Sequence, residues 1–218
     1  MTSASPGPGW TGATGRPTRV ILARHGQTEL SVDRRYSGQG DPELTDVGRE
    51  QAERTAARLA STPRLTAIYS SPLRRCLGTA ERAAQLAGVP LVVDHDLIET
   101  DFGQWEGLTF GEAAERDPEL HSRWLGDTSV PPPDGESFAV VRTRVERALR
   151  RIVGDRPGEI VAVVSHVSPI KLAIRYGLGV GDGLMFRLHL DLASVSDVRF
   201  YSDGPTSVHL VNDTSHLG

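Results

Sequence analysis

The stretch TRVILARHG, residues 18–26, passes from an apolar strand directly into a cation, an imidazole and a glycine. Its apolar run is typical of a buried strand. A strand that only filled a core would not need Arg24 and His25 at its tip. A second stretch, EIVAVVSH at residues 159–166, repeats the pattern as the clearest buried strand in the chain and ends in His166. These two stretches are the framework from which the fold is predicted.

Helical and strand patterns alternate around this framework. A helix is expected from a Thr45 cap to about Ala60, with Val47 among the residues on its inner side. The other expected elements are strands over 65–70, 91–93, 186–201 and 206–212, and helices over 72–87, 109–126, 136–153 and 168–176. The alternation predicts an α/β fold, a three-layer α/β/α sandwich with a mostly parallel sheet and helices on both faces.

Charged side chains follow several of the predicted strands. In open α/β sheets ligands bind outside the carboxyl ends of the strands, so His25 and His166 are expected on the same rim. SSPLRR at residues 70–75 puts Arg75 at the start of a helix, and Glu99 falls in a turn-rich loop after the 91–93 strand. With Arg24, these side chains predict one pocket that holds two imidazoles, two guanidiniums and a carboxyl group.

That combination of groups suits phosphoryl transfer. Guanidinium groups match the oxygens of a phosphomonoester, whose transition state spreads charge over three equatorial oxygens. One neutral imidazole can attack phosphorus, while a second, protonated imidazole adds a donor and a positive charge. A carboxyl group that begins protonated can deliver its proton to the leaving oxygen and then take one from water. No metal or other cofactor is needed for this scheme, because the cations belong to the protein.

The chain resembles the histidine phosphatase (phosphoglycerate mutase-like) superfamily. The resemblance lies in RHG at 24–26 with Thr28, SSPLRR at 70–75, ETDFGQWEG at 99–107, GES at 135–137 and SH at 165–166, and it covers essentially all of residues 18–170. By position, His25 resembles the nucleophile that becomes phosphohistidine. Arg24, Arg75 and His166 resemble the phosphate clamp, with Arg75 chosen over Arg74, and Glu99 resembles the proton donor. The implied fold is phosphoglycerate mutase-like.

The resemblance also implies residues that bind the substrate. They are Arg24, Thr28, Gly38, Gln39, Arg75, His166 and Val167, although Gly38 and Gln39 also read as turn residues. Two positions depart from the family pattern. Ser31 stands where the family often has an asparagine, and Val167 stands where it often has a glycine after the second histidine.

Longer matching stretches narrow the resemblance. TELSVDRRYSGQGDPELT, SHVSPIK and HLDLAS are similar to the acid phosphatase half of bacterial bifunctional ribonuclease H/acid phosphatase proteins, which are in turn similar to α-ribazole phosphatase. Related chains would then carry a ribonuclease H domain fused or adjacent to this one. Residues 1–17, rich in Pro, Gly and Ser, are expected to be a disordered tail or linker remnant, and residues 18–218 the phosphatase domain.

Composition limits the classes of protein to which the chain can belong. The 218 residues have a net charge of −4, which argues against a nucleic-acid-binding domain. No apolar run is long enough to cross a membrane and no secretory signal is visible, so a cytoplasmic protein is expected. The sequence does not indicate the oligomeric state. The expected partner is a small phosphorylated substrate such as α-ribazole phosphate, hydrolysed fastest at acidic pH because the proton donor must begin protonated.

Several other interpretations remain open. CLGTAER at 76–82 matches the Cys-x5-Arg spacing of thiolate phosphatases, although its helical spacing and few glycines argue against that chemistry. Asp94-His95-Asp96 could be drawn as a metal site or as a turn. Glu136 of the GES motif could serve only the first turn of a helix. The chain could also be a phosphoglycerate mutase-type phosphoryl transferase or a non-catalytic module that binds phosphorylated ligands.

Overall fold

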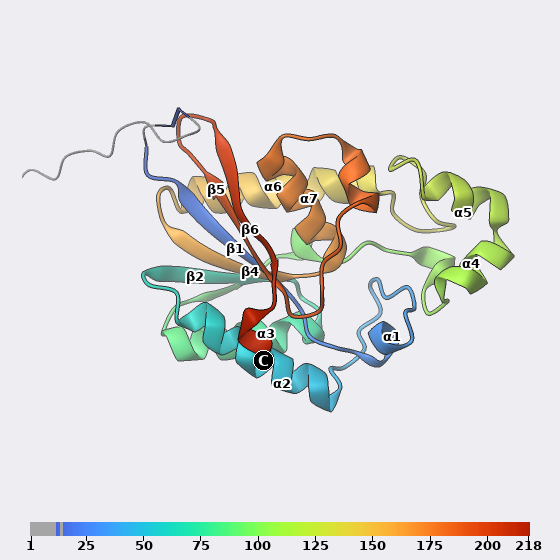
Figure 1. The fold of residues 1–218 in the computed structure, drawn as a ribbon, viewed down its shortest axis with the longest axis horizontal. Coiled ribbons are helices and arrows are strands. Elements are labelled where there is room, and N and C mark those ends of the chain that lie inside the picture. Colours follow the sequence, from blue (N-terminus) through green and yellow to red (C-terminus); the bar gives the residue numbers. More distant parts are fainter. Residues whose placement is uncertain (1–11, 14) are drawn as a thin grey trace, which may run out of the picture.

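The computed structural model describes residues 12, 13 and 15–218, and it contains one six-stranded sheet. The strands are β1 (Thr18–Arg24), β2 (Leu65–Ser70), β3 (Leu91–Val93), β4 (Ile160–Ser165), β5 (Val195–Phe200) and β6 (Thr206–Asp213). They lie in the order β3-β2-β4-β1-β5-β6 (Figure 1). β3, β2, β4 and β1 run parallel to one another, whereas β5 pairs with both β1 and β6 in antiparallel fashion.

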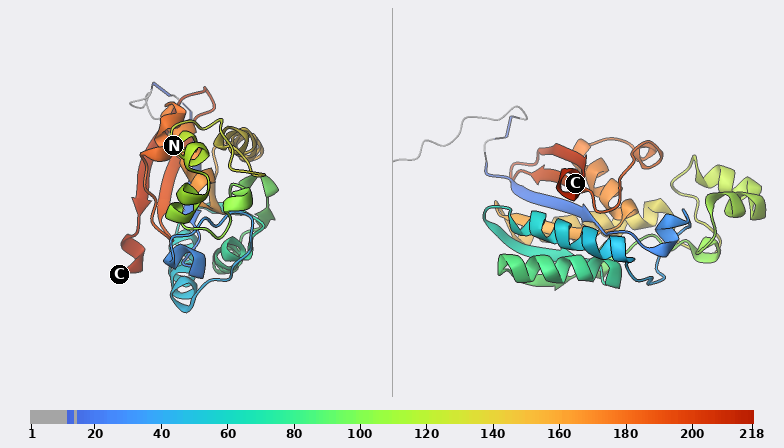
Figure 2. Two further views of the ribbon diagram at one scale, coloured as in Figure 1. Left: turned by 90° about the vertical axis from the view of Figure 1, so that its right-hand side faces the viewer. Right: turned by 60° about the horizontal axis from the view of Figure 1, so that its bottom comes forward.

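Helices cover both faces of the sheet, which confirms the predicted three-layer sandwich. α2 (Asp46–Ala60) and α3 (Arg74–Ala87) lie on one face, and α6 (Phe138–Asp155) and α7 (Val167–Leu178) lie on the other (Figure 1). α1 (Glu29–Val32), α4 (Phe110–Arg116) and α5 (Pro118–Trp124) lie beyond the end of the sheet (Figure 2). Short 3₁₀ turns complete the fold: η1 (His95–Leu97), η2 (Gly103–Trp105), η3 (Asp182–Phe186) and η4 (Ser215–Leu217).

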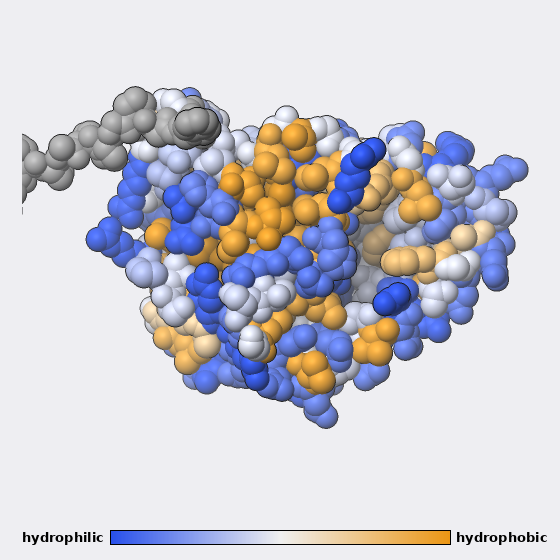
Figure 3. All heavy atoms as spheres, viewed as in Figure 1, coloured by the Kyte–Doolittle hydropathy of each residue, from blue (hydrophilic) through white to orange (hydrophobic). Residues whose placement is uncertain are grey.

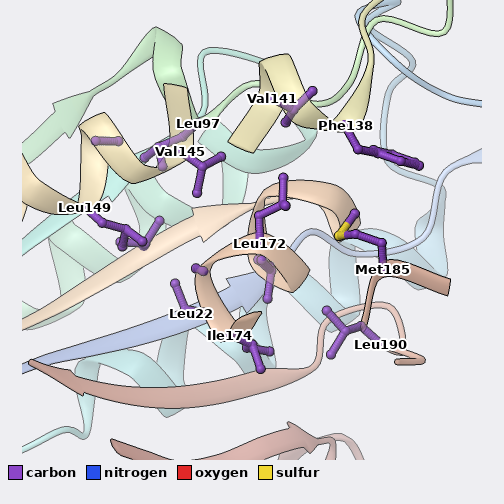
Figure 4. Close-up of a cluster of buried hydrophobic side chains, with 14 of the residues drawn as sticks. Leu22, Leu97, Phe138, Val141, Val145, Leu149, Leu172, Ile174, Met185 and Leu190 are labelled. Atoms are coloured by element: carbon purple, nitrogen blue, oxygen red, sulfur yellow. The ribbon is translucent and has the colours of Figure 1, made fainter. Parts of the chain in front are cut away.

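The pleat of the strands separates two hydrophobic cores. Side chains alternate between the faces of a strand, so Val20 and Leu22 of β1 join the core under α6 and α7, while Ile21 and Ala23 join the core under α2 and α3. Figure 4 shows the first of these cores, with Leu22 facing residues of α6 and α7. Alternation on a strand that is covered on both sides explains why its sequence reads as one continuous apolar run.

The register of α2 differs from the expected one. Thr45 caps this helix as predicted, and its hydroxyl oxygen accepts from the Gly48 N–H at 3.0 Å. Val47, however, is 52% exposed, and the buried face begins at Gly48. A Cβ on Gly48 would lie 2.0 Å from the Gln27 carbonyl oxygen, so the helix packs by its bare backbone at this point. The prediction that Val47 lies on the inner side was therefore wrong.

The strand expected over residues 186–201 begins later than predicted. β5 starts at Val195, and residues 187–194 form a loop that follows η3. This loop passes over the end of β1, where the Leu190 carbonyl oxygen accepts a hydrogen bond from Arg24 at 2.6 Å. The apolar pattern alone could not distinguish this loop, which buries Leu190 and Ala193 but exposes His189, from a strand.

The tail expected over residues 1–17 lies mostly outside the described residues. Of the part that is described, Ala13 is buried, and β1 begins at Thr18. Within the described part of the chain, no helix is both long and apolar enough to span a bilayer.

Candidate active site

The carboxyl ends of the parallel strands point toward α1, α4 and α5 in Figure 1, and the surface in this region is hollowed in Figure 3. His25 follows β1 and His166 follows β4, which is the neighbouring parallel strand. Their ring centroids are 5.1 Å apart. The strand register therefore places the two imidazoles on one rim, as the sequence predicts.

The hydrogen bonding of His25 identifies the ring nitrogen that is free to react. Nδ1 lies 2.8 Å from the Gly26 carbonyl oxygen, which can only accept a hydrogen bond, so Nδ1 carries the proton. Burial, followed by the positive charges of Arg75 and Arg24, lowers the pKa of His25 well below its usual value. The ring is therefore neutral at physiological pH, with its lone pair on Nε2.

His166 is fully buried at the start of α7. Its Nε2 lies 2.7 Å from Ser71 Oγ and 3.4 Å from Cys76 Sγ. Burial, followed by the charge of Arg75, lowers the pKa of His166 well below its usual value, and the charges of Arg24 and Arg144 act in the same direction. The ring is therefore neutral in the protein alone, and the expectation that it is protonated beside a bound phosphate stays a prediction. A phosphate dianion beside the ring would act in the opposite direction and raise this pKa.

Two guanidinium groups flank the histidines. Arg75 is completely buried and donates to the carbonyl oxygens of Gly40 and Gly38 at 2.8 and 2.7 Å. Among the described residues, the Nε–H groups of Arg24 and Arg75 are buried without a hydrogen-bond partner. Buried donors without acceptors are costly, and an anion bound at the site would supply acceptors. Arg74, the alternative in the same motif, instead points outward and pairs with Asp41 and Glu43.

Glu99 lies next to this charged group and is only 2% exposed. Its Oε1 accepts from the Thr100 N–H at 2.7 Å, and its Oε2 accepts from the Ser168 N–H at 3.4 Å. Ser168 belongs to the first turn of α7, immediately after His166. The carboxyl group is therefore fixed relative to the second imidazole, and it is close enough to Arg24 for their charges to interact.

The residues predicted to bind the substrate differ in their burial and in the structural contacts that they make. The Thr28 hydroxyl caps α1, and Val167 packs against the core under α6 and α7. Gly38 is buried, and its N–H donates to Glu106 at 2.8 Å, so Glu106 holds the 38–40 loop. Gln39 is exposed between Gly38 and Gly40, and the Gly40 N–H also donates to Glu106, at 3.3 Å. The roles of these residues in substrate binding remain predictions.

The structure rejects the thiolate alternative. Cys76 lies inside α3 with no exposed surface, and burial raises the pKa of its thiol to about 12. Arg82, the arginine of the Cys-x5-Arg spacing, points outward and pairs with Glu53. A protonated thiol without an arginine partner is a poor nucleophile for phosphorus.

The Asp94-His95-Asp96 stretch also has a structural explanation. Asp94 pairs with Arg151, and Asp96 pairs with both Arg147 and Arg151 of α6. These two carboxylates tie η1 to α6, which favours the turn interpretation over a metal site.

Sequence reasoning missed three residues that support the site: Ser71, Arg144 and Ser165. Ser71 and Ser165 both belong to the quoted motifs, SSPLRR and SH, but spacing alone does not indicate which groups their hydroxyls contact. Arg144 lies on the inner face of α6 and donates to the Glu99 carbonyl oxygen at 2.9 Å. A buried arginine on an otherwise apolar helix face was the available signal.

Comparison with known proteins identifies the family. The model of the histidine phosphatase superfamily (branch 1) matches residues 20–214. The chain belongs to this superfamily. It is 56% identical over 216 residues to the "Bifunctional protein Rv2228c" of Mycobacterium tuberculosis, a match that covers 99% of this chain but only 59% of that protein. The chain thus spans little more than half the length of this relative.

Shorter relatives match over nearly their whole length. The histidine phosphatase chain is 33% identical to "Phosphoserine phosphatase 1" of Hydrogenobacter thermophilus, covering 92% of this chain and 94% of that one. Among solved structures, a putative α-ribazole-5'-P phosphatase from Escherichia coli superimposes with a TM-score of 0.80 at 27% identity, covering 90% and 96% of the two chains. Several relatives of this chain are therefore named as phosphatases, while another, from Arabidopsis thaliana, is named "Phosphoglycerate mutase-like protein 4".

Proposed function

We propose that the chain is a metal-independent phosphomonoesterase of the acid phosphatase type that works through a phosphohistidine on His25. The observation that carries this proposal is the 2.8 Å contact between His25 Nδ1 and the Gly26 carbonyl oxygen, which places the proton on Nδ1 and leaves Nε2 as an unprotonated nucleophile. The guanidinium groups of Arg24 and Arg75 would hold the phosphate oxygens beside it.

The reaction would proceed in two steps. His25 Nε2 attacks phosphorus and forms a P–N bond, while the ester P–O bond breaks and Glu99 gives its proton to the leaving oxygen. Glu99, now a carboxylate, takes a proton from water as the water attacks the phosphohistidine. The P–N bond breaks, inorganic phosphate leaves, and His25 and the protonated Glu99 are restored. Atoms and protons balance without a further reactant.

The proposed substrates are small phosphorylated metabolites. The α-ribazole, phosphoserine and glucosyl-3-phosphoglycerate phosphatases among its relatives support this class, and we propose α-ribazole phosphate as the first compound to test. As the resemblance implies, related longer chains would carry a ribonuclease H domain beside this one. We propose that the phosphatase domain itself binds no nucleic acid.

The first test traps the intermediate. Purified protein mixed with a labelled phosphomonoester and quenched in alkali should retain phosphate on His25, because phosphohistidine survives base and is lost in acid. His25→Asn should abolish both labelling and turnover, whereas the matched variant Cys76→Ala should keep both. An active His25→Asn protein, or label that survives acid, would overturn the proposal.

A second test addresses the reaction type and the substrate. Values of kcat/KM should be measured for α-ribazole phosphate, phosphoserine, glucosyl-3-phosphoglycerate and 3-phosphoglycerate, and their order ranks the substrates. Adding the chelator EDTA should leave each of these values unchanged. The pH–rate profile should fall toward alkaline pH, because the proton donor must begin protonated. Transfer of phosphate between positions of phosphoglycerate, faster than its release, would favour the mutase alternative.

A further inference from the structure

In the loop that carries Glu99, the main-chain carbonyl oxygens accept hydrogen bonds from buried side chains. Arg144 donates to the carbonyl oxygens of residues 96, 98 and 99 at 3.0, 2.5 and 2.9 Å. The remaining carbonyl in this run, that of Leu97, accepts from Ser165 Oγ at 2.7 Å. Four consecutive carbonyl oxygens outside any strand thus depend on two side chains. Buried carbonyl groups need such partners, so these contacts determine the path of the loop.

Arg144 is itself held in place by the GES motif. Glu136 accepts from Arg144 Nε and Nη2 at 3.2 and 2.9 Å, in a paired arrangement that leaves the arginine only 8% exposed. Glu136 also accepts from the Asp101 N–H at 3.1 Å and donates its own N–H to the Asp101 carbonyl oxygen at 2.8 Å. The segments on both sides of Glu99 are therefore tied to one ion pair.

The loop is anchored further by packing. Leu97 is 2% exposed and lies beside Val145 of α6 in Figure 4, on the helix that also carries Arg144. Ser165 immediately precedes His166, so the same loop is tied to the strand end that presents the second imidazole. These contacts leave the Glu99 main chain little freedom to move relative to the two histidines.

We propose that Arg144 and Glu136 are positioning residues that hold the Glu99 carboxyl group where it can protonate the leaving oxygen. This proposal rests on the proposed function, in which Glu99 is the general acid. A general acid must lie within hydrogen-bond reach of the atom that it protonates, so a shift of this loop weakens proton transfer before it weakens phosphate binding. The GES motif then acts on the reaction and not only on the first turn of α6.

Arginine suits this position better than lysine. A guanidinium group offers five N–H donors in a fixed plane, and Arg144 uses them on three carbonyl oxygens and one carboxylate. An ammonium group has three donors on a single nitrogen and cannot span these acceptors. Arg144→Lys should therefore keep the charge while releasing part of the loop.

Substrates with different leaving groups can distinguish a positioning role of Arg144 and Glu136 from a merely structural one. An alkyl phosphate releases a strongly basic alkoxide, which requires the proton from Glu99. p-Nitrophenyl phosphate releases a weakly basic phenoxide, which leaves without it. Loss of proton delivery should therefore lower kcat for the alkyl ester selectively, whereas general loosening of the site would lower both rates together.

The experiment compares Arg144→Lys and Glu136→Gln with the parent protein on phosphoserine and p-nitrophenyl phosphate. For both variants, kcat on phosphoserine should fall on the order of 10²-fold, which is the lower range of general acid catalysis. The kcat on p-nitrophenyl phosphate and the KM of both esters should change only a few fold. Glu136→Gln retains the shape of the side chain and carries the test even if Arg144→Lys folds poorly.

Two controls make the outcome decisive. Arg147→Lys changes an exposed arginine of the same helix that contacts only the Asp96 side chain of this loop, and it should leave the ratio of the two rates unchanged. Glu99→Gln should lose the alkyl ester selectively; if it does not, the assignment of the general acid has failed independently of Arg144. If Glu99→Gln behaves as expected but the Arg144 and Glu136 variants lose both esters equally, the positioning role is overturned.

Discussion

Ser71 is the immediate support of the second imidazole. Its hydroxyl oxygen lies 2.7 Å from His166 Nε2, and neither residue has exposed surface. The sulfur of Cys76 is a second polar neighbour of this ring, at 3.4 Å, and a thiol is a weak hydrogen-bonding group. The orientation of His166 therefore depends chiefly on one hydroxyl group.

Ser71→Ala should consequently destabilise the fold. The substitution leaves a buried ring nitrogen without its main partner, which costs about 1–3 kcal/mol in the free energy of unfolding. Urea unfolding followed by circular dichroism measures the change. Ser61→Ala is the matched control, because the exposed Ser61 hydroxyl bonds only to Arg58 O of its own helix, and it should change stability by less than about 0.5 kcal/mol. Equal effects of the two variants would show that the Ser71 contact is unimportant.

Single residues show where sequence reasoning succeeds and where it fails. His25, His166 and Glu99 could be predicted to share one rim, because a strand boundary fixes which end of the sheet a residue occupies. Ser71 and Arg144 could not, because spacing does not reveal which buried nitrogen or carbonyl lacks a partner. The lowered pKa of His166 could not be predicted for a related reason, since burial and the surrounding charges cause it and neither can be read from the sequence.

At the scale of the element, α2 is positioned by a backbone contact. A Cβ on Gly48 would lie 2.0 Å from the Gln27 carbonyl oxygen, and a Cβ on Gly26 would lie 2.5 Å from the Gly48 carbonyl oxygen. The glycine that follows His25 therefore serves the close approach of α2 to the site. The hydrophobic pattern favoured Val47 because such patterns register apolar side chains and carry no signal for packing through glycine.

Two glycine substitutions should consequently have opposite effects. Gly48→Ala must displace α2 from the Gln27 backbone, so both the melting temperature and the phosphatase activity should fall. Gly154→Ala, near the end of α6, adds a methyl group in open space and should stabilise the fold by up to about 1 kcal/mol, the helix propensity difference between the two residues. Thermal unfolding measures both, and a stable, fully active Gly48→Ala protein would refute the contact.

For the whole molecule, the histidines predict how stability depends on pH. The pKa values of His25, His121, His166 and His216 are all lowered, in each case chiefly by burial. The unfolded chain therefore binds more protons than the native protein once the pH falls below the ordinary histidine pKa of about 6.5. The contribution of these residues to stability is fully present above that pH and is lost as the pH falls below it.

Urea unfolding between pH 7 and pH 5 tests this expectation. The free energy of unfolding should fall with decreasing pH by up to about 1.4 kcal/mol per pH unit for each neutral buried histidine. The double variant His25→Asn/His166→Asn should show a shallower slope, while His189→Asn, at a side chain that is 79% exposed, should leave the slope unchanged. A slope that is insensitive to the double variant would contradict the neutral state of the two rings.

The fold class could be predicted from the sequence because both faces of the sheet are covered. The buried strands then appear as continuous apolar runs, whereas the helices show apolar residues at helical spacing. The region beyond the sheet was harder to predict. α4 and α5 are seven residues each, and a helix of two turns has too few positions to establish a period. The hollow in Figure 3 lies beside these helices, so the segments next to the candidate site are those whose sequence pattern is least informative.

The order of the strands also has a consequence for biosynthesis. β4 lies between β1 and β2 in the sheet, yet it is the fourth strand along the chain. A nascent polypeptide that has not reached Ile160 lacks the strand that joins β1 to β2, so each of these two strands has an apolar edge without its partner, although β3 can already pair with the other edge of β2. Such unpaired edges are prone to aggregation. The nascent chain should therefore need a chaperone to cover these edges until β4, the central strand, leaves the ribosome and pairs with them.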